Sequence, residues 1–127
     1  MDFDPSKPIW LQLVDEFTRR IATGTWAPGQ RMPSVRDLAA ELGVNPNTVQ
    51  RALGELERSG LAATERTAGR FVTTDTGLVQ RARIDLVTAA ADAFIAQATG
   101  LRLSAEAAST LVADRWSHAN RPHQEER

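Results

Sequence analysis

Cysteine and tyrosine are absent from the 127-residue sequence, and lysine occurs only once, as Lys7. Without cysteine, the chain can form no disulfide framework, thiolate zinc site, iron–sulfur cluster or cysteine nucleophile. No run approaches 18 consecutive apolar residues, and the N-terminal residues lack the apolar core of a signal peptide. We therefore expect a cytoplasmic protein without a membrane partner, since the lack of cysteine also fits a reducing compartment.

Patterns of catalytic or metal-ligating residues are equally scarce. The only histidines, His118 and His123, lie near Glu125 and Glu126 in a polar stretch that Pro122 interrupts. A metal site there would have to order a disordered tail, at an entropic cost. No GxSxG, P-loop or GxGxxG motif occurs. We expect neither an enzyme nor a bound metal or cofactor.

Three regions differ in composition. Residues 1–75 hold five of the six prolines and six of the eight glycines, which separate short periodic segments. Residues 76–118 are rich in alanine, lack proline and follow a helical apolar period. Residues 119–127 are polar, and we expect this tail to be disordered.

The first periodic segment predicts a helix of about four turns that begins near Pro8 and ends before Gly24. Its apolar stripe consists of Trp10, Leu13, Val14, Phe17 and Ile21. These residues recur at helical spacing and so form one face of the predicted helix.

Two short helices joined by a tight turn follow. Ser34 suits the N-cap of the first helix, and Gly43 suits its end. Asn45 and Pro46 suit the start of the second helix, and Gly60 suits its end. This arrangement is typical of a helix-turn-helix.

After the second helix, the period changes to that of two short strands, near residues 61–65 and 70–74, around a turn at Gly69. A hairpin directly after a helix-turn-helix is a wing. The sequence therefore predicts a mainly α fold with a small β-hairpin: a winged helix-turn-helix over residues 1–75, followed by a two-helix module over residues 76–118.

The outer face of the second helix carries the candidate base-reading residues. If its apolar residues point inward, Asn47, Gln50 and Arg51 lie on the opposite side near the helix start, where recognition helices contact bases. Asparagine and glutamine pair with adenine, and arginine pairs with guanine. Gly54 shares this face, where a small residue permits close approach to DNA or fits a neighbour.

Arginines beside this helix suit phosphates or a minor groove. The full set of predicted DNA-binding residues is Ser34, Arg36, Asn47, Thr48, Gln50, Arg51, Arg66, Gly69 and Arg70. Ordinary solvation explains any one of these polar residues equally well, and a positive-φ turn explains Gly69. Their order along the chain, as a set, favours DNA.

Charge alone gives no support for a nucleic-acid partner, because 15 basic and 16 acidic residues leave a formal charge of −1. Residues 30–72 hold six arginines against five acidic residues. This balance predicts weak DNA binding by one chain and useful affinity only from a dimer.

The C-terminal helices have an apolar surface that is wider than one partner helix can cover. A second copy of the chain is the simplest cover. The predicted dimer-interface residues are Leu78, Ala82, Leu86, Ala90, Phe94, Leu111 and Trp116. A pocket for a small-molecule effector near Phe94 and Trp116 is left open, although close helix packing explains the same residues.

The run PGQRMPSVRDLAAELGVNPNTVQRALGELERSGLAATERTAGRFV resembles the winged helix-turn-helix of the GntR family of bacterial transcription regulators. The resemblance spans about residues 8–73, and its most specific parts are PSVRDLA and GVNPNTV. The VNPNT start and the short two-helix tail are similar to the YtrA subfamily. The resemblance implies a homodimer joined by its C-terminal helices. It also implies a repressor that often regulates its own operon together with genes for an ABC transporter.

The family's DNA-contacting residues carry over in part. The arginine of the Ser-x-Arg element matches Arg36, and the wing glycine matches Gly69. Where many relatives have two arginines in the recognition helix, this chain has Pro46 and Gln50, with Arg51 one residue later. These departures change side chains of the recognition helix, so they affect which operator sequence the protein reads.

A protein–protein adaptor is the alternative function, because winged helices also bind proteins and a fold does not dictate a function. An adaptor should expose apolar residues at the start of the recognition helix. This chain has polar, donor-rich residues there, so the predicted partner is double-stranded DNA.

Overall fold

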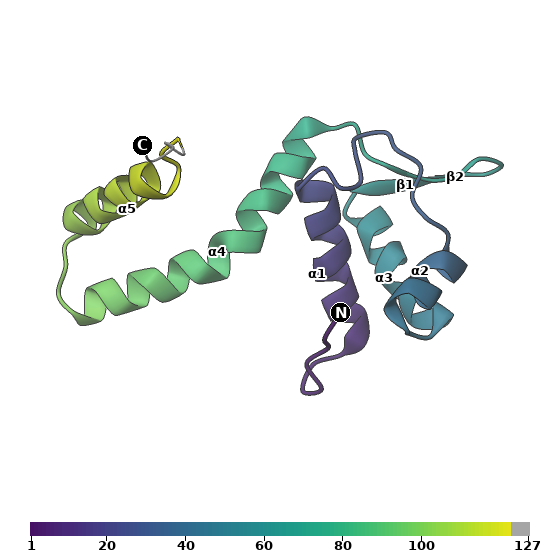
Figure 1. Ribbon diagram of the computed structural model, residues 1–127, viewed down its shortest axis with the longest axis horizontal. Helices are drawn as coiled ribbons and strands as arrows, with labels where there is room; N and C mark the ends of the chain where they lie inside the picture. Colours follow the sequence, from purple (N-terminus) through teal and green to yellow (C-terminus); the bar gives the residue numbers. More distant parts are fainter. Residues whose placement is uncertain (123–127) are drawn as a thin grey trace, which may run out of the picture. The chain divides into compact units, whose positions relative to one another are not determined.

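The computed structural model describes residues 1–122, which form five helices and one two-stranded antiparallel sheet (Figure 1). The elements are α1 (Ile9–Ala22), α2 (Val35–Leu42), α3 (Pro46–Arg58), β1 (Ala62–Glu65), β2 (Gly69–Val72), α4 (Thr76–Gly100) and α5 (Ala105–Ala119). The predicted fold class, a winged helix-turn-helix followed by two helices, is confirmed. Within the described range, no helix has the length and hydropathy needed to cross a membrane.

The helix-turn-helix begins and ends at the predicted residues. The Ser34 hydroxyl accepts a hydrogen bond from the Asp37 amide, at 3.1 Å, and caps α2. The Asn45 side chain accepts one from the Asn47 amide, at 2.7 Å, and caps α3. Gly43 has a φ of +67°, the left-handed conformation that suits glycine after a helix. These local side-chain contacts set where α3 starts.

The chain divides into two compact units within α4: the winged-helix unit, residues 1–86, and the helical unit, which begins at residue 87. This division falls later than residue 75, where the composition changes. Val79 and Ala82 explain the difference, because both are buried in the winged-helix core. In addition, the Arg83 guanidinium donates a hydrogen bond to the Ala22 carbonyl at 3.0 Å.

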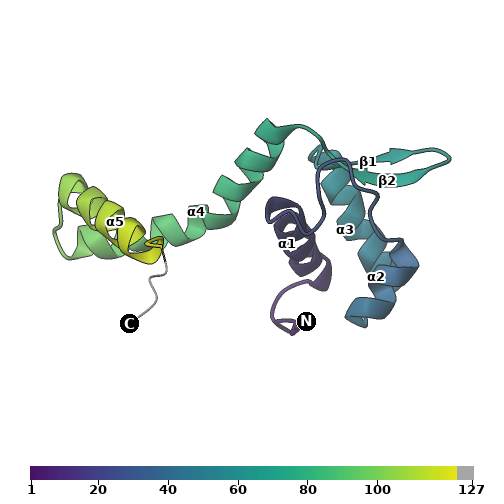
Figure 2. The same cartoon turned by 45° about the horizontal axis from the view of Figure 1, so that its top comes forward.

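All elements of the winged-helix unit contribute to one core. Its buried residues are Leu13, Phe17, Ile21, Trp26, Met32, Leu38, Ala39, Val49, Ala52, Leu53, Leu56, Leu61, Ala62, Val72, Val79 and Ala82. The hairpin extends away from the helices in both views (Figures 1 and 2). Trp10 shares the apolar stripe of α1 but is only half-buried and lies outside this core. The spacing of the stripe is correct, but the core ends before it reaches the first turn of the helix.

Arg20 joins α1 to α2. Its guanidinium binds Glu41 at 2.6 Å and Glu16 at 2.9 Å, and it lies over the rings of Trp26 and Phe17. The hydrogen bond to Glu41 is the main cause that raises the pKa of Arg20, and the same bond lowers the pKa of Glu41. This cluster holds α1 against α2, the first helix of the helix-turn-helix.

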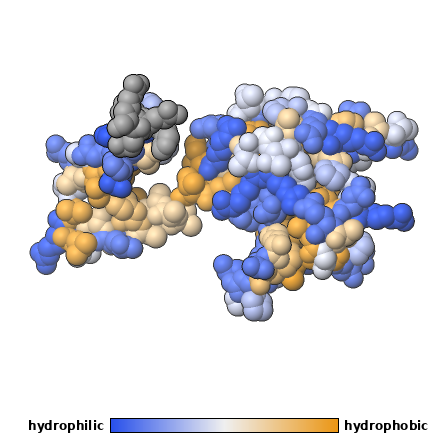
Figure 3. Space-filling view, viewed as in Figure 1, coloured by the Kyte–Doolittle hydropathy of each residue, from blue (hydrophilic) through white to orange (hydrophobic). Residues whose placement is uncertain are grey.

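In the helical unit, α4 and α5 bury little of their apolar surface. Ala98 is buried, whereas α5 has no buried residue. The large exposed apolar residues are Val87, Ile95, Leu101, Leu103, Leu111, Val112 and Trp116. Figure 3 shows apolar surface along these helices. Of the predicted tail, Ala119 ends α5, and residues 123–127 lie outside the described part.

Candidate nucleic-acid interface

The start of α3 presents a polar surface. Asn47, Gln50 and Arg51 are exposed, as the helical period predicts, while Thr48 is half-buried. Val49 and Leu53, on the opposite side of the helix, are fully buried. The exposed groups are hydrogen-bond donors and acceptors of the kind that pair with base edges in a major groove.

Arg51 lies against α1. Its Cζ is 3.9 Å from the centroid of the Trp10 ring, which is a close cation–π contact. The sequence predicts Arg51 to be a base reader and places Trp10 on the apolar stripe of the first helix. The structure brings them together, 41 positions apart in the chain.

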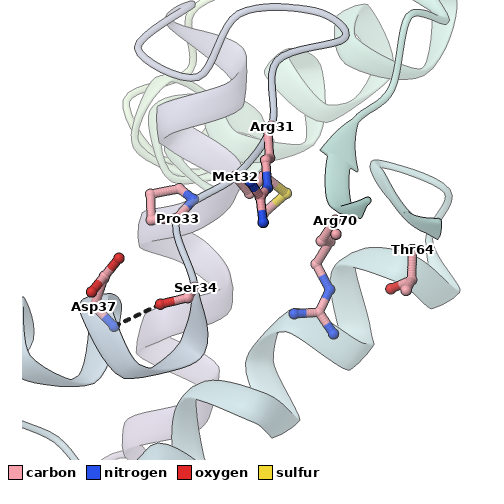
Figure 4. A pocket seen from close by; sticks show the side chains of 8 residues that line it. Arg31, Met32, Pro33, Ser34, Asp37, Thr64 and Arg70 are labelled. Carbon is pink, nitrogen blue, oxygen red and sulfur yellow. Dashed lines mark hydrogen bonds between the residues drawn. The ribbon is translucent and has the colours of Figure 1, made fainter. Parts of the chain in front are cut away.

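A hollow of about 520 Å³ lies between the start of α2 and the wing (Figure 4). Arg31, Ser34 and Asp37 line one side of it, and Thr64 and Arg70 line the other. In Figure 4, the Arg31 and Arg70 side chains reach into the same space from different segments. The hollow therefore brings two guanidinium groups beside the helix-turn-helix.

Arg31 was not among the predicted DNA-binding residues. The backbone places it beside β2, because the Met32 amide donates to the Arg70 carbonyl at 2.8 Å and Arg31 forms a bridge with Phe71. A Cβ atom on Gly69 would stand 2.9 Å from the Arg31 Nε. Gly69 also has a φ of +109°, a backbone conformation that favours glycine at this wing position, whereas the flexible Arg31 side chain could move away from a Cβ atom. The sequence offered one signal, an arginine directly after the turn that precedes α2.

Arg70, a predicted DNA contact, is tied to α3. Its Nε donates to the Glu57 carboxylate at 2.6 Å, and the Thr64 hydroxyl donates to the same oxygen. The Arg70 bond is the main cause that holds the pKa of Glu57 below its ordinary value. Arg70 therefore anchors the wing to α3, and Glu57 compensates its charge.

Ion pairs divide the arginines of this region into paired and unpaired ones. Glu41, Glu55 and Glu57 each pair with an arginine, at 2.6, 3.2 and 2.6 Å. The described residues contain no ion-pair partner for four exposed arginines of this region: Arg31, Arg36, Arg51 and Arg66. Their positive charge is available to phosphates or base edges.

The predicted interface residues of the C-terminal helices fall into two groups. Leu78 packs against the winged-helix core, and Ala82 is buried in it. Leu86 and Phe94 are half-buried, whereas Ala90, Leu111 and Trp116 are exposed. Phe94 and Trp116 also line an apolar hollow of about 590 Å³ between α4 and α5, within the helical unit.

Metal-binding chemistry has little basis in the described part of the chain. His118 lies in α5, and the predicted neighbours His123, Glu125 and Glu126 lie outside the described residues. Through residue 122, no group of three histidine, aspartate or glutamate side chains is arranged to hold a metal ion.

Residues 10–72 match the family model described as bacterial regulatory proteins, gntR family. The chain is 36% identical over 104 residues to the uncharacterized HTH-type transcriptional regulator YhcF of Bacillus subtilis, covering 82% of this chain and 86% of that protein. It is 39% identical over 74 residues to the HTH-type transcriptional repressor YtrA of the same species, covering 57% of each protein.

Solved structures agree with these matches. A GntR family transcriptional regulator from Listeria monocytogenes superposes with a TM-score of 0.76 at 36% identity, covering 88% of this chain and 98% of that one. The DNA-binding domain of AraR, in complex with operator ORX1, superposes with a TM-score of 0.52 at 27% identity, covering 57% of this chain and 93% of that one. Together with the winged helix-turn-helix and its exposed arginines, these similarities show that the chain belongs to the GntR family and is a DNA-binding transcriptional regulator rather than an enzyme.

Proposed function

We propose that the protein is a cytoplasmic, homodimeric repressor of the YtrA type that binds an inverted-repeat operator. Its targets are its own operon and genes for an ABC transporter, as the resemblance to that subfamily implies. The similarity to the Bacillus subtilis repressor YtrA supports repression. The surface of the winged-helix unit supports operator binding.

The observation that carries the proposal is the grouping of unpaired arginines around the polar start of α3. Asn47, Gln50 and Arg51 read bases in a major groove. The remaining predicted contacts, to the backbone or a minor groove, come from Ser34, Arg36, Thr48, Arg66, Gly69 and Arg70. Arg31 adds a phosphate contact from the hollow between α2 and the wing, where its charge has no ion-pair partner among the described residues.

A second copy of the chain covers the exposed apolar face of the helical unit. Leu111 and Trp116 are exposed there, although soluble proteins seldom leave so wide an apolar surface open to water. A two-fold dimer presents two copies of α3 and requires an operator with matching symmetry. The half-sites then lie about 10 or about 20 base pairs apart, one or two turns of DNA.

The test is selection of binding sites from randomised duplex DNA by the purified full chain at near-physiological salt. We expect enrichment of an inverted repeat with one fixed spacing. A folded, dimeric protein that enriches no sequence would contradict operator binding and would favour a protein-binding adaptor. Placing the selected site at a reporter promoter then tests repression, since higher reporter output in the presence of the protein would contradict a repressor.

A further inference from the structure

Trp10 is a large aromatic side chain that the core does not use. It lies in the first turn of α1 and is half-buried outside the core. The Arg51 guanidinium lies over its ring, 3.9 Å from Cζ to the centroid. The aromatic ring at this position therefore packs against a side chain of α3 that faces away from the core.

Arg51 is exposed, and none of the described residues forms an ion pair with it. A free arginine side chain samples many rotamers in water, and binding DNA must select among them at an entropic cost. Stacking uses the planar face of the guanidinium and leaves its N–H edge free. That edge is the part of arginine that pairs with O6 and N7 of guanine.

The geometry points to Trp10 as a positioning residue that holds Arg51 for reading guanine in the operator. This inference rests on the proposed base reading by α3 and names how one of its side chains is oriented. Its consequence is specific. Loss of the Trp10 ring should weaken discrimination at one base pair of each half-site, whereas phosphate contacts made by other arginines continue to hold any DNA sequence.

The experiment compares Trp10→Ala, Trp10→Phe, Arg51→Ala and the Trp10→Ala/Arg51→Ala double variant with the wild type. Leu11→Ala is the matched control, because Leu11 is the neighbouring exposed residue on α1. Affinity is measured at fixed salt on the selected operator and on operators with each base pair substituted symmetrically. Every measurement is made below the unfolding transition of the variant. If Trp10→Ala fails to fold, Trp10→Leu replaces it, because leucine keeps apolar volume without an aromatic face.

Arg51→Ala should lower affinity for the operator about ten- to a hundredfold and abolish the guanine preference at one position. Trp10→Ala should lower affinity about two- to fivefold and weaken the preference at that same position. Trp10→Phe should restore most of the preference, because it keeps an aromatic face. The double variant should lose no more than Arg51→Ala alone, and Leu11→Ala should match the wild type.

Three outcomes overturn the inference. Full base preference in Trp10→Ala, or equal weakening on all duplexes, leaves Trp10 with a structural role only. Retention of the guanine preference in Arg51→Ala assigns base reading to other residues of α3 and leaves the proposed function intact. Failure of the wild type to prefer any duplex would instead contradict the proposed function itself.

Discussion

The helices of the winged-helix unit gather their apolar residues on one face, whereas α4 and α5 spread theirs around the helix, and the two units bury these residues differently. Leu13, Phe17 and Leu53 are fully buried in the winged-helix unit, whereas α5 has no buried residue. Helix α4 shows both behaviours, since Ala82 is 8% exposed and Ile95 is 53% exposed. The comparison teaches that a one-sided apolar period predicts a face buried within the chain, whereas a wide apolar surface does not say what covers it.

The largest effect should come from a cavity in the core of the winged-helix unit. Leu53→Ala removes a fully buried side chain from α3 and leaves a cavity, so we expect a loss of about 2–5 kcal/mol in the free energy of unfolding. Urea denaturation followed by circular dichroism measures this loss. An equal loss in Leu101→Ala, whose side chain is 76% exposed, would contradict the contrast between the two units.

The next largest effect should appear in the formation of the proposed dimer. Leu111→Asp places a charge on the exposed face of α5, so we expect monomers in sedimentation experiments while the winged-helix unit stays folded. Operator affinity should fall about a hundredfold or more, because one half-site contact no longer assists the other. A variant that remains dimeric at low micromolar concentration would place the interface elsewhere.

Removal of single arginines should separate phosphate contacts from base contacts within the winged-helix unit. Arg36→Ala and Arg31→Ala should each weaken binding to all sequences alike and reduce the slope of log affinity against log salt by about one. Arg81→Ala is the control, since it removes the same charge from an exposed position on α4. An unchanged salt slope for Arg31→Ala would show that the hollow makes no phosphate contact.

Substitutions at two glycines should have smaller effects on stability, and the two effects should be opposite in sign. A Cβ atom on Gly54 would meet nothing within 4 Å in this chain, so Gly54→Ala should stabilise α3 by about 0.5–1 kcal/mol. Gly69→Ala should instead destabilise the wing by about 1–3 kcal/mol, because of the positive φ at this position. Thermal unfolding measures both. Loss of operator affinity in a stabilised Gly54→Ala would show that DNA approaches α3 closely at this point.

The smallest effect concerns the ion pair between the wing and α3. Because Arg70 lowers the pKa of Glu57 in the folded state, the pair stabilises the fold above the ordinary glutamate pKa of 4.5. This contribution is lost as the pH falls through the lowered pKa. Glu57→Gln should therefore cost about 0.2–1 kcal/mol at pH 7 and progressively less below pH 4.5. A cost that stays constant down to pH 3 would rule out a role for the charge.

Much of the winged-helix unit could be predicted because its boundaries depend on neighbours in the chain. Ser34, Gly43 and Asn45 each act within a few residues, through a cap or a left-handed turn. The exposure of Asn47 and Gln50 follows from the helical period alone. The boundary between the units could not be predicted in this way, because it depends on which residues of α4 reach the core.

The candidate DNA-binding site, too, could be predicted only in part from the sequence. Sequence reasoning treated Arg51, Arg70 and Gly69 as members of one class, yet each has a different environment. Arg51 stacks on Trp10, and Arg70 binds Glu57. Gly69 lies against Arg31, a residue that sequence reasoning left out. Each contact joins segments that are distant in the chain, so neither local propensity nor periodicity carries information about it.

The sequence by itself determined the order of the elements, the capped start of the recognition helix and its polar outer face. These features follow from backbone conformation, short-range hydrogen bonds and the 3.6-residue period. Only the tertiary structure decided which arginines are neutralised, which are free and which aromatic ring lies outside the core. The physical reason is that charge compensation and stacking act over a few ångströms of space, and packing alone brings distant residues within that range.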